Sequence, residues 1–235
     1  MVAIRALDSC RVEQIRGGNM DKHVKAVIFD FDYTLGDSTL GIIQSVNHGL
    51  TSMGHSAASD EQIRRTIGLS LSDTYKVLTR DENAENSRQF ATFFKEKADK
   101  VMVANTELFP DVAKTLQVLH NRKIRNGILT TKYHFRIDQI LEKCGVTDLF
   151  DETIGGDDVA EPKPAPEGMF RILARMRINK ADVLYVGDSL VDAKTAMQAG
   201  VDFVAVTTGT TSAEDFDQYP NVAVINNISE LLDLI

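Results

Sequence analysis

Two aspartates one residue apart, Asp30 and Asp32, directly follow an apolar run near the start of the chain, and Thr34 comes next. The run, residues 24–29, is apolar except for Lys25, which is typical of a strand buried on both faces of a parallel sheet. Ligands of open parallel sheets bind beyond the carboxyl ends of the strands. Two carboxylates there repel each other unless a cation lies between them, and Mg²⁺ prefers oxygen ligands. Taken alone, the stretch is also compatible with a solvated acidic turn, which is the less favoured interpretation.

Two further polar groups follow in the second half of the chain. Thr130 and Thr131 end an expected strand over residues 124–130, where a hydroxyl commonly caps the next helix. Lys163 lies between two prolines, which hold the chain extended and stiff around a single positive charge. Such a segment also suits a rigid linker, so neither group indicates a site when taken singly.

The last group follows an expected strand over residues 183–186. Gly187 allows the chain to turn sharply, Asp188 comes next, and Asp192 lies one helical turn later. An aspartate near a helix start is often only a cap. The four groups nevertheless occur in order, and each lies at or near the end of an expected strand. Together they suit phosphoryl transfer, which needs an in-line nucleophile, cations on the phosphoryl oxygens and a placed proton donor.

The elements that must position these groups alternate between strand and helix. Residues 38–104 show only helical periodicity, whereas strands and helices alternate from residue 109 to a final helix over residues 228–234. This pattern predicts an α/β fold, with a parallel sheet covered by helices on both faces and an inserted all-helical domain. The expected domains are a core of residues 20–37 and 105–235 and a cap of residues 38–104, after a loosely attached extension over residues 1–19.

Composition excludes several classes of protein. The chain of 235 residues is 43% hydrophobic and carries a net charge of −8, which argues against nucleic acid or an anionic membrane as its main partner. Two cysteines, Cys10 and Cys144, do not indicate a disulfide framework or a zinc site. No apolar run is long enough to span a bilayer, and the first residues lack the apolar segment of a secretory signal. We therefore expect a cytoplasmic protein, monomeric or homodimeric.

The four groups resemble the four motifs of the haloacid dehalogenase superfamily. The helical insert after the first motif is similar to the type-one cap of that superfamily, whose core is a Rossmann-like sheet. The resemblance covers nearly everything from residue 24 onward, and it is strongest to the phosphoglycolate phosphatase and β-phosphoglucomutase-like group. The residues that carry it are Asp30, Asp32, Thr34, Leu35, Thr130, Lys163, Pro164, Gly187, Asp188, Ser189 and Asp192.

The resemblance implies a role for each acidic residue. Asp30 would be the nucleophile that takes the phosphoryl group, and Asp32 would be the general acid and then the general base. Mg²⁺ would be held by Asp30, by the main-chain carbonyl of Asp32 and by Asp188. Asp192 would support the metal site directly, through water or through Lys163.

The remaining motif residues would bind the phosphoryl group or support the loops around it. Thr130, Thr131 and Lys163 would hold phosphoryl oxygens, and Thr34 and Gly187 would support the loops. Thr34 also favours the phosphatases, because the mutases of the group tend to have an aliphatic residue there.

One position departs from the family pattern. Tyr33 stands where the family usually has glycine, and its bulk would narrow substrate choice or slow turnover at the junction of cap and core. Residues 68–70, at a helix break, are expected to reach the core site. Arg64 and Arg65 precede this loop, and one of them could meet an anionic substrate, although arginines are usually solvated surface residues.

The leading hypothesis is a Mg²⁺-dependent phosphatase that hydrolyses a small phosphorylated metabolite, such as a phosphoglycolate-like or sugar-phosphate-like monoester, through an aspartyl-phosphate. A phosphomutase or pyrophosphatase on the same scaffold is the enzymatic alternative. A dehalogenase is disfavoured, because it does not need the proton transfer that Asp32 supplies. The non-enzymatic alternative is a phosphometabolite-binding module whose site Tyr33 blocks.

Overall fold

A six-stranded parallel sheet forms the centre of the protein in a computed structural model that describes residues 24–235. The expected extension over residues 1–19 lies outside the described residues. The strand order is β5-β4-β1-β6-β7-β8, which places the first strand in the middle of the sheet. The strands are β1 (Ala26–Phe29), β4 (Arg125–Leu129), β5 (Glu152–Ile154), β6 (Val183–Gly187), β7 (Asp202–Val206) and β8 (Ala223–Ile225).

Helices cover both faces of the sheet because its central strands are apolar on both sides. In β1, Val27 and Phe29 join a core cluster on one face, and Ala26 and Ile28 join a second cluster on the other. The first cluster includes side chains of α5 and α6, and the second includes side chains of α7 and α8. These helices are α5 (Val112–Asn121), α6 (His134–Cys144), α7 (Glu167–Met176) and α8 (Leu190–Ala199).

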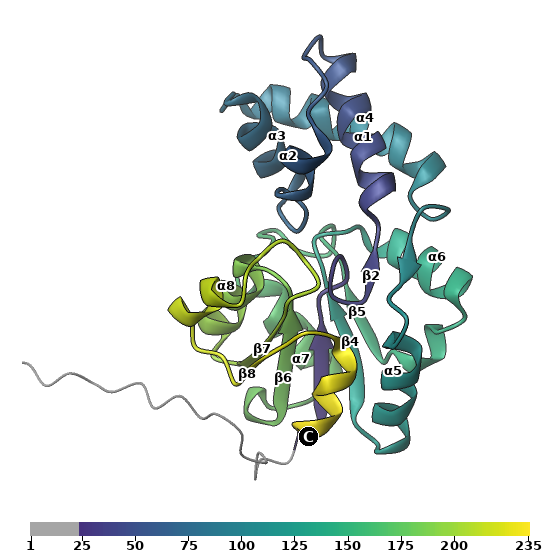
Figure 1. The fold of residues 1–235 in the computed structure, drawn as a ribbon, viewed down its shortest axis with the longest axis vertical. Coiled ribbons are helices and arrows are strands. Elements are labelled where there is room, and N and C mark those ends of the chain that lie inside the picture. The colour runs from purple at the N-terminus through teal and green to yellow at the C-terminus, as the bar shows by residue number, and fades with distance from the viewer. Residues whose placement is uncertain (1–23) are drawn as a thin grey trace, which may run out of the picture.

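Four further helices form a separate layer beyond the carboxyl end of β1 (Figure 1). Their apolar faces meet in a third core cluster, which is centred on buried aromatic side chains such as Tyr75 and Phe90. The helices are α1 (Thr39–Ser52), α2 (Asp60–Arg64), α3 (Leu71–Thr79) and α4 (Ala84–Val101). We call this layer the cap. Its third cluster is distinct from the two clusters that flank the sheet.

A short antiparallel ribbon joins the cap to the core. Strands β2 (Gly36–Asp37) and β3 (Glu107–Leu108) pair there, with Gly36 opposite Leu108. Two residues are too short a run to show alternation in a sequence, so this ribbon was not expected. The helix expected over residues 228–234 is present as a 3-10 helix, Ile228–Asp233, which begins after a side-chain cap by Asn227. Other 3-10 turns are Thr147–Leu149, Lys180–Asp182 and Glu214–Gln218.

The predicted fold class is confirmed: helices surround a parallel sheet and an all-helical insert follows its first strand. The domain boundaries remain a prediction. Within the part of the chain that the structure describes, no helix combines the length and apolar character that crossing a membrane requires.

Candidate active site

The polar residues that follow three neighbouring strands meet at one edge of the sheet. Strands β4, β1 and β6 lie side by side and run parallel, so their carboxyl ends share that edge. Asp30 follows β1, Thr130 follows β4 and Asp188 follows β6, and all three side chains are buried. The structure thus brings these three expected site residues into one neighbourhood, where ligands of parallel sheets bind.

Lys163 reaches this edge from the loop between β5 and α7, and its ammonium group contacts two carboxylates. Nζ lies 2.9 Å from Asp30 Oδ1 and 2.7 Å from Asp192 Oδ1. Nζ also donates a hydrogen bond of 3.1 Å to the hydroxyl of Tyr185. The lysine side chain is only 3% exposed. Because a buried ammonium needs charged partners, the two aspartates fix the position of Lys163.

Asp192 lies in the first turn of α8, and both of its carboxylate oxygens already accept hydrogen bonds. Oδ1 accepts from Lys163 and from the Tyr185 hydroxyl at 2.6 Å. Oδ2 accepts from the main-chain N–H and the hydroxyl of Ser189, at 3.1 and 2.6 Å. Gly187 makes room for this arrangement, because a Cβ there would lie 2.4 Å from Asp192 Cγ. Asp192 therefore ties Lys163 to the start of α8.

A second ion pair lies beside the first. Lys132 Nζ is 3.0 Å from Asp32 Oδ2, and the two side chains are 6% and 9% exposed. Asp32 Oδ1 is buried and makes no hydrogen bond, and the same is true of the Thr34 hydroxyl. Thr131 donates a long hydrogen bond of 3.5 Å to the main-chain oxygen of Gly68 in the cap. Asp32 thus keeps one oxygen available for a ligand.

Burial and mutual repulsion raise the pKa values of two of these acids, Asp30 and Asp188. Burial, followed by the charges of Asp192 and Asp32, raises the pKa of Asp30 to about 7 even though Lys163 opposes the shift. Burial, Asp192 and Asp30 also raise the pKa of Asp188 well above its ordinary value. Burial lowers the pKa of Lys163, but the two aspartates outweigh that effect and raise it overall, so Lys163 stays charged.

The donor set fits a hard divalent cation. Among the described residues, Asp30, Asp188 and Asp192 each place a carboxylate oxygen within 4.8 Å of the others, and all three are buried. Together with Asp32, four carboxylates face two lysines, so ionised acids leave an excess of negative charge. Asp192 is occupied by protein donors, which leaves Asp30 and Asp188 as the carboxylates with free coordination capacity.

Tyr33 turns its side chain toward the cap. Its φ is 60°, in the left-handed region that favours glycine. The hydroxyl lies 2.8 Å from Thr39 Oγ1 at the start of α1 and accepts a 3.2 Å hydrogen bond from Arg64 of α2. The Thr208 hydroxyl donates a hydrogen bond to the main-chain oxygen of Tyr33. Arg65, in contrast, pairs with the neighbouring Glu61 on the surface.

Replacing Tyr33 by phenylalanine tests what this hydroxyl does. The substitution leaves the buried hydroxyl of Thr39 and the half-buried Arg64 without their shared partner. We expect unfolding free energy to fall by about 1 kcal/mol, seen as a shift of about 2–4 °C in thermal unfolding. Hydrolysis should change less than about tenfold, because the acids around Lys163 are untouched. The control is Tyr219→Phe, because the Tyr219 hydroxyl has no hydrogen-bond partner among residues 24–235. A far larger loss of activity in Tyr33→Phe would give the Tyr33 hydroxyl a catalytic role.

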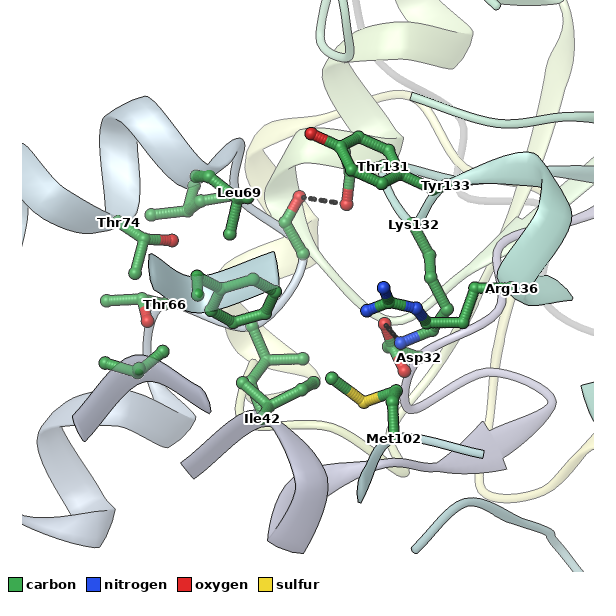
Figure 2. Close-up of a pocket in the computed structure, with 15 residues that line it drawn as sticks. Asp32, Ile42, Thr66, Leu69, Thr74, Met102, Thr131, Lys132, Tyr133 and Arg136 are labelled. Atoms are coloured by element: carbon green, nitrogen blue, oxygen red, sulfur yellow. Dashed lines mark hydrogen bonds and ion pairs between the residues drawn. The ribbon is translucent and has the colours of Figure 1, made fainter. Parts of the chain in front are cut away.

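A cavity of about 70 Å³ lies between cap and core (Figure 2). Gly68 approaches the core here, since a Cβ on it would lie 3.8 Å from Ser189 Oγ. The structure thus places one residue of the expected 68–70 loop against the core. The core side of the cavity is polar, with Asp32, Thr131, Lys132, Tyr133 and Arg136. The cap side is mainly apolar, with Ile42, Val46, Thr66, Ile67, Gly68, Leu69, Leu71, Thr74, Phe94 and Met102.

Sequence reasoning gave no role to four residues of this neighbourhood. Lys132 had a signal, because an amine two residues after the expected strand lies near the site by chain geometry alone. Ser189 had one as well, since a serine three residues before an aspartate forms a capping box. Tyr185 and Arg136 had none, because one lies in an apolar strand and the other in an ordinary helix pattern.

The sequence pattern of the haloacid dehalogenase-like hydrolases matches residues 27–206, which is most of the chain. The chain belongs to this family. The family prediction is therefore confirmed.

Relatives of this haloacid dehalogenase-like hydrolase are similar over nearly their whole length. A phosphoglycolate phosphatase from Photorhabdus laumondii is 29% identical over 91% of this chain and 93% of its own. Another from Aliivibrio fischeri is 31% identical over 86% of this chain and 93% of its own. The crystal structure of a haloacid dehalogenase-like hydrolase from Bacteroides fragilis is 42% identical, with a TM-score of 0.86 over 88% of this chain and 99% of that one. The predicted phosphoglycolate phosphatase-like group is thus confirmed as well.

Proposed function

We propose that this hydrolase is a Mg²⁺-dependent phosphatase that removes the phosphoryl group of a small phosphorylated metabolite through an aspartyl-phosphate. The observation that carries the proposal is the placement of Asp30 beside Lys163, next to a cavity that Asp32 and Lys132 line. A nucleophile, a fixed cation and a proton-transfer group are the parts that phosphoryl transfer needs. The names of the curated relatives agree with this chemistry.

The reaction divides between the two aspartates of the first motif. An oxygen of Asp30 attacks phosphorus, and the bond to the leaving oxygen breaks while Asp32 gives that oxygen its proton. In the second half, Asp32 takes a proton from water, the water oxygen attacks phosphorus and the bond to Asp30 breaks. Lys132 Nζ lies 3.0 Å from Asp32 Oδ2 and holds this carboxylate in position.

Thr130, Thr131 and Lys163 are proposed to bind the phosphoryl oxygens. Lys163 remains charged because Asp192 and Asp30 together outweigh its burial. It can therefore offset negative charge on the phosphoryl group as Asp30 approaches. Thr34 and Gly187 are proposed to stabilise the loops and not to bind the substrate. Gly187 does so because its lack of a Cβ leaves room for Asp192 beside the end of the strand.

Asp30 and Asp188 are the side chains proposed to hold Mg²⁺, with the main-chain carbonyl of Asp32. Their buried oxygens form the donor set described above, and Asp192 acts through Lys163 instead. When bound, the metal would neutralise charge on the phosphoryl oxygens and on the acids around it. A cytoplasmic location and a monomeric or homodimeric state complete the proposal.

The other candidate functions have less support. No contact in the described residues favours a phosphomutase or a pyrophosphatase over a monoester phosphatase. A module that only binds phosphometabolites would not need Asp30 and Asp32 beside separate lysines. Tyr33 does not block the site in the manner that this alternative requires, because its hydroxyl points to Thr39 and Arg64.

Hydrolysis of a generic aryl phosphate, with added Mg²⁺ and with a metal chelator, tests the proposal. We expect at least about a hundredfold loss of rate on chelation, reversed by Mg²⁺, because the excess carboxylate charge would otherwise repel the phosphoryl group. Acid-quenched protein labelled from a radioactive phosphate ester should carry an acid-stable, base-labile phosphoryl group. Folded protein with no metal-dependent hydrolysis of any phosphate ester would refute the phosphatase proposal.

A further inference from the structure

Arg136 is a buried cation of the core whose ion-pair partner lies in the cap. It lies in the first turn of α6 in the core, and its side chain is 3% exposed. Its guanidinium pairs with Asp99 of α4 in the cap. The Asp99 side chain is 56% exposed. A buried arginine is thus balanced by a carboxylate that is itself largely in water.

The same arginine lines two adjoining spaces. It lies on the core side of the cap–core cavity together with Asp32 and Lys132, and Figure 2 shows its guanidinium turned into that cavity. It also lines an outer cleft of about 430 Å³, which Asp99 and Tyr133 border as well. Arg136 and Tyr133 therefore stand where the open cleft meets the small inner cavity.

Among the described residues that line the inner cavity, Arg136 is the cation available to a second anionic group of a substrate. Lys132 is engaged with Asp32, and the remaining side chains of the cavity carry no positive charge. The wall that faces Arg136 from the cap is mainly apolar, with side chains such as Phe94 and Met102. An anionic group at the end of a substrate would therefore bind the guanidinium of Arg136. A guanidinium binds a carboxylate with two parallel hydrogen bonds, which fixes direction as well as charge.

We propose that Arg136 is the specificity-determining residue for the leaving group, and that it binds a carboxylate of the substrate in exchange for Asp99. This inference rests on the proposed phosphatase function. The leaving group would be short, because the cavity of about 70 Å³ is smaller than the roughly 150 Å³ that accommodates benzene. The substrate class is then a phosphorylated short-chain acid rather than a sugar phosphate.

Two substrates of equal chain length separate this role from a merely structural one. Phosphoglycolate and ethyl phosphate share a two-carbon leaving group, and only the first carries a carboxylate. We expect the wild type to favour phosphoglycolate by about a hundredfold in kcat/KM, since a site built for a polar group discriminates strongly against its absence. Arg136→Gln should remove most of that preference, chiefly by raising KM for phosphoglycolate. Hydrolysis of ethyl phosphate should change less than about threefold.

Three matched variants sharpen the test. Arg136→Lys keeps the charge but loses the paired hydrogen bonds, so part of the preference should return. Asp99→Asn removes the competing carboxylate, so KM for phosphoglycolate should fall a few-fold while ethyl phosphate is unaffected. Arg171→Gln, which breaks an exposed ion pair with Glu167 on α7, should leave both substrates unchanged. Thermal unfolding of each variant monitors the fold.

The outcomes distinguish this inference from the proposed function. Equal losses for both substrates in Arg136→Gln, or no wild-type preference for phosphoglycolate, would overturn the role of Arg136 and leave the phosphatase intact. Hydrolysis of aryl phosphate without hydrolysis of phosphoglycolate would do the same. Failure with every phosphate ester would overturn the phosphatase itself, and the role of Arg136 with it.

Discussion

Replacing Asp30 by asparagine is expected to reduce kcat for phosphate ester hydrolysis by at least about 10⁴-fold. The amide has nearly the size of the carboxylate but does not form the acyl phosphate. Lys163 keeps Asp192 as its ion partner at 2.7 Å, so the site should retain its shape. Initial rates with saturating Mg²⁺ measure the effect, and labelling from a radioactive ester should disappear in parallel.

The control for this substitution is Asp138→Asn, because Asp138 lies on α6 with a side chain that is 62% exposed. Its rates should stay within about twofold of wild type, as for most exposed substitutions. Retained labelling or only a modest loss in Asp30→Asn would mean that another group attacks phosphorus, which would contradict the role given to Asp30.

Replacing Asp188 by asparagine should have two opposite effects. Loss of a proposed metal carboxylate should lower Mg²⁺-dependent hydrolysis by at least about a hundredfold at ordinary Mg²⁺ concentrations. The metal-free protein should nevertheless become more stable at about pH 8. Burial and two neighbouring acids raise the pKa of Asp188, so its ionised form is unfavourable in the folded chain. A neutral amide removes that penalty.

The pH dependence has a definite sign. A carboxyl whose pKa is raised by folding binds its proton more tightly in the folded chain, so its contribution to stability is lost as pH rises through the folded pKa. Metal-free wild type should therefore lose stability as the pH rises through the raised pKa values of Asp30, at about 7, and of Asp188, and Asp188→Asn should lose less because it lacks one of these two acids. A gain of roughly 1 kcal/mol at the higher pH corresponds to about 2–4 °C in thermal unfolding.

Asp182→Asn is a matched control at the opposite end of β6. Asp182 precedes the strand and forms an ion pair with Lys25, whose side chain is 53% exposed. Its replacement should not stabilise the protein at high pH, since an exposed ion pair contributes little in either direction. Thermal scans in chelator at low and at high pH compare the three proteins. If Asp188→Asn melts lower than wild type at high pH, then Asp188 is not held in the unfavourable environment described here.

The sheet and its edge were predictable from short stretches of sequence. The run Val183–Gly187 is buried throughout, and such runs occur only where helices cover both faces. Once the strands are known to be parallel, their carboxyl ends must share an edge. The meeting of Asp30 with Asp188 follows from that topology, although nothing in the sequence measures the distance between them.

Contacts between cap and core were not predictable in the same way. Arg136 and Asp99 are ordinary charged residues on two amphipathic helices, and their pairing depends on how the cap sits on the core. The direction of the Tyr33 side chain depends on a left-handed backbone angle that a tyrosine rarely adopts. Tyr185 looks like any aromatic residue of an apolar strand, and only the folded chain brings its hydroxyl to Asp192.

The ribbon of β2 and β3 holds the two ends of the cap segment side by side. Gly36 and Leu108 are opposite each other in that ribbon, so the chain leaves the core and returns to it at adjacent points. The cap also has an apolar cluster of its own, apart from the two that flank the sheet. The core therefore holds the two ends of the insert together as it would hold the ends of a tight hairpin loop. The entropy cost of closing this long insertion is only slightly larger than that of closing a short turn. The cap wall of the cavity can thus change by exchange of one contiguous segment, while Arg136 and the residues around Asp30 stay as they are.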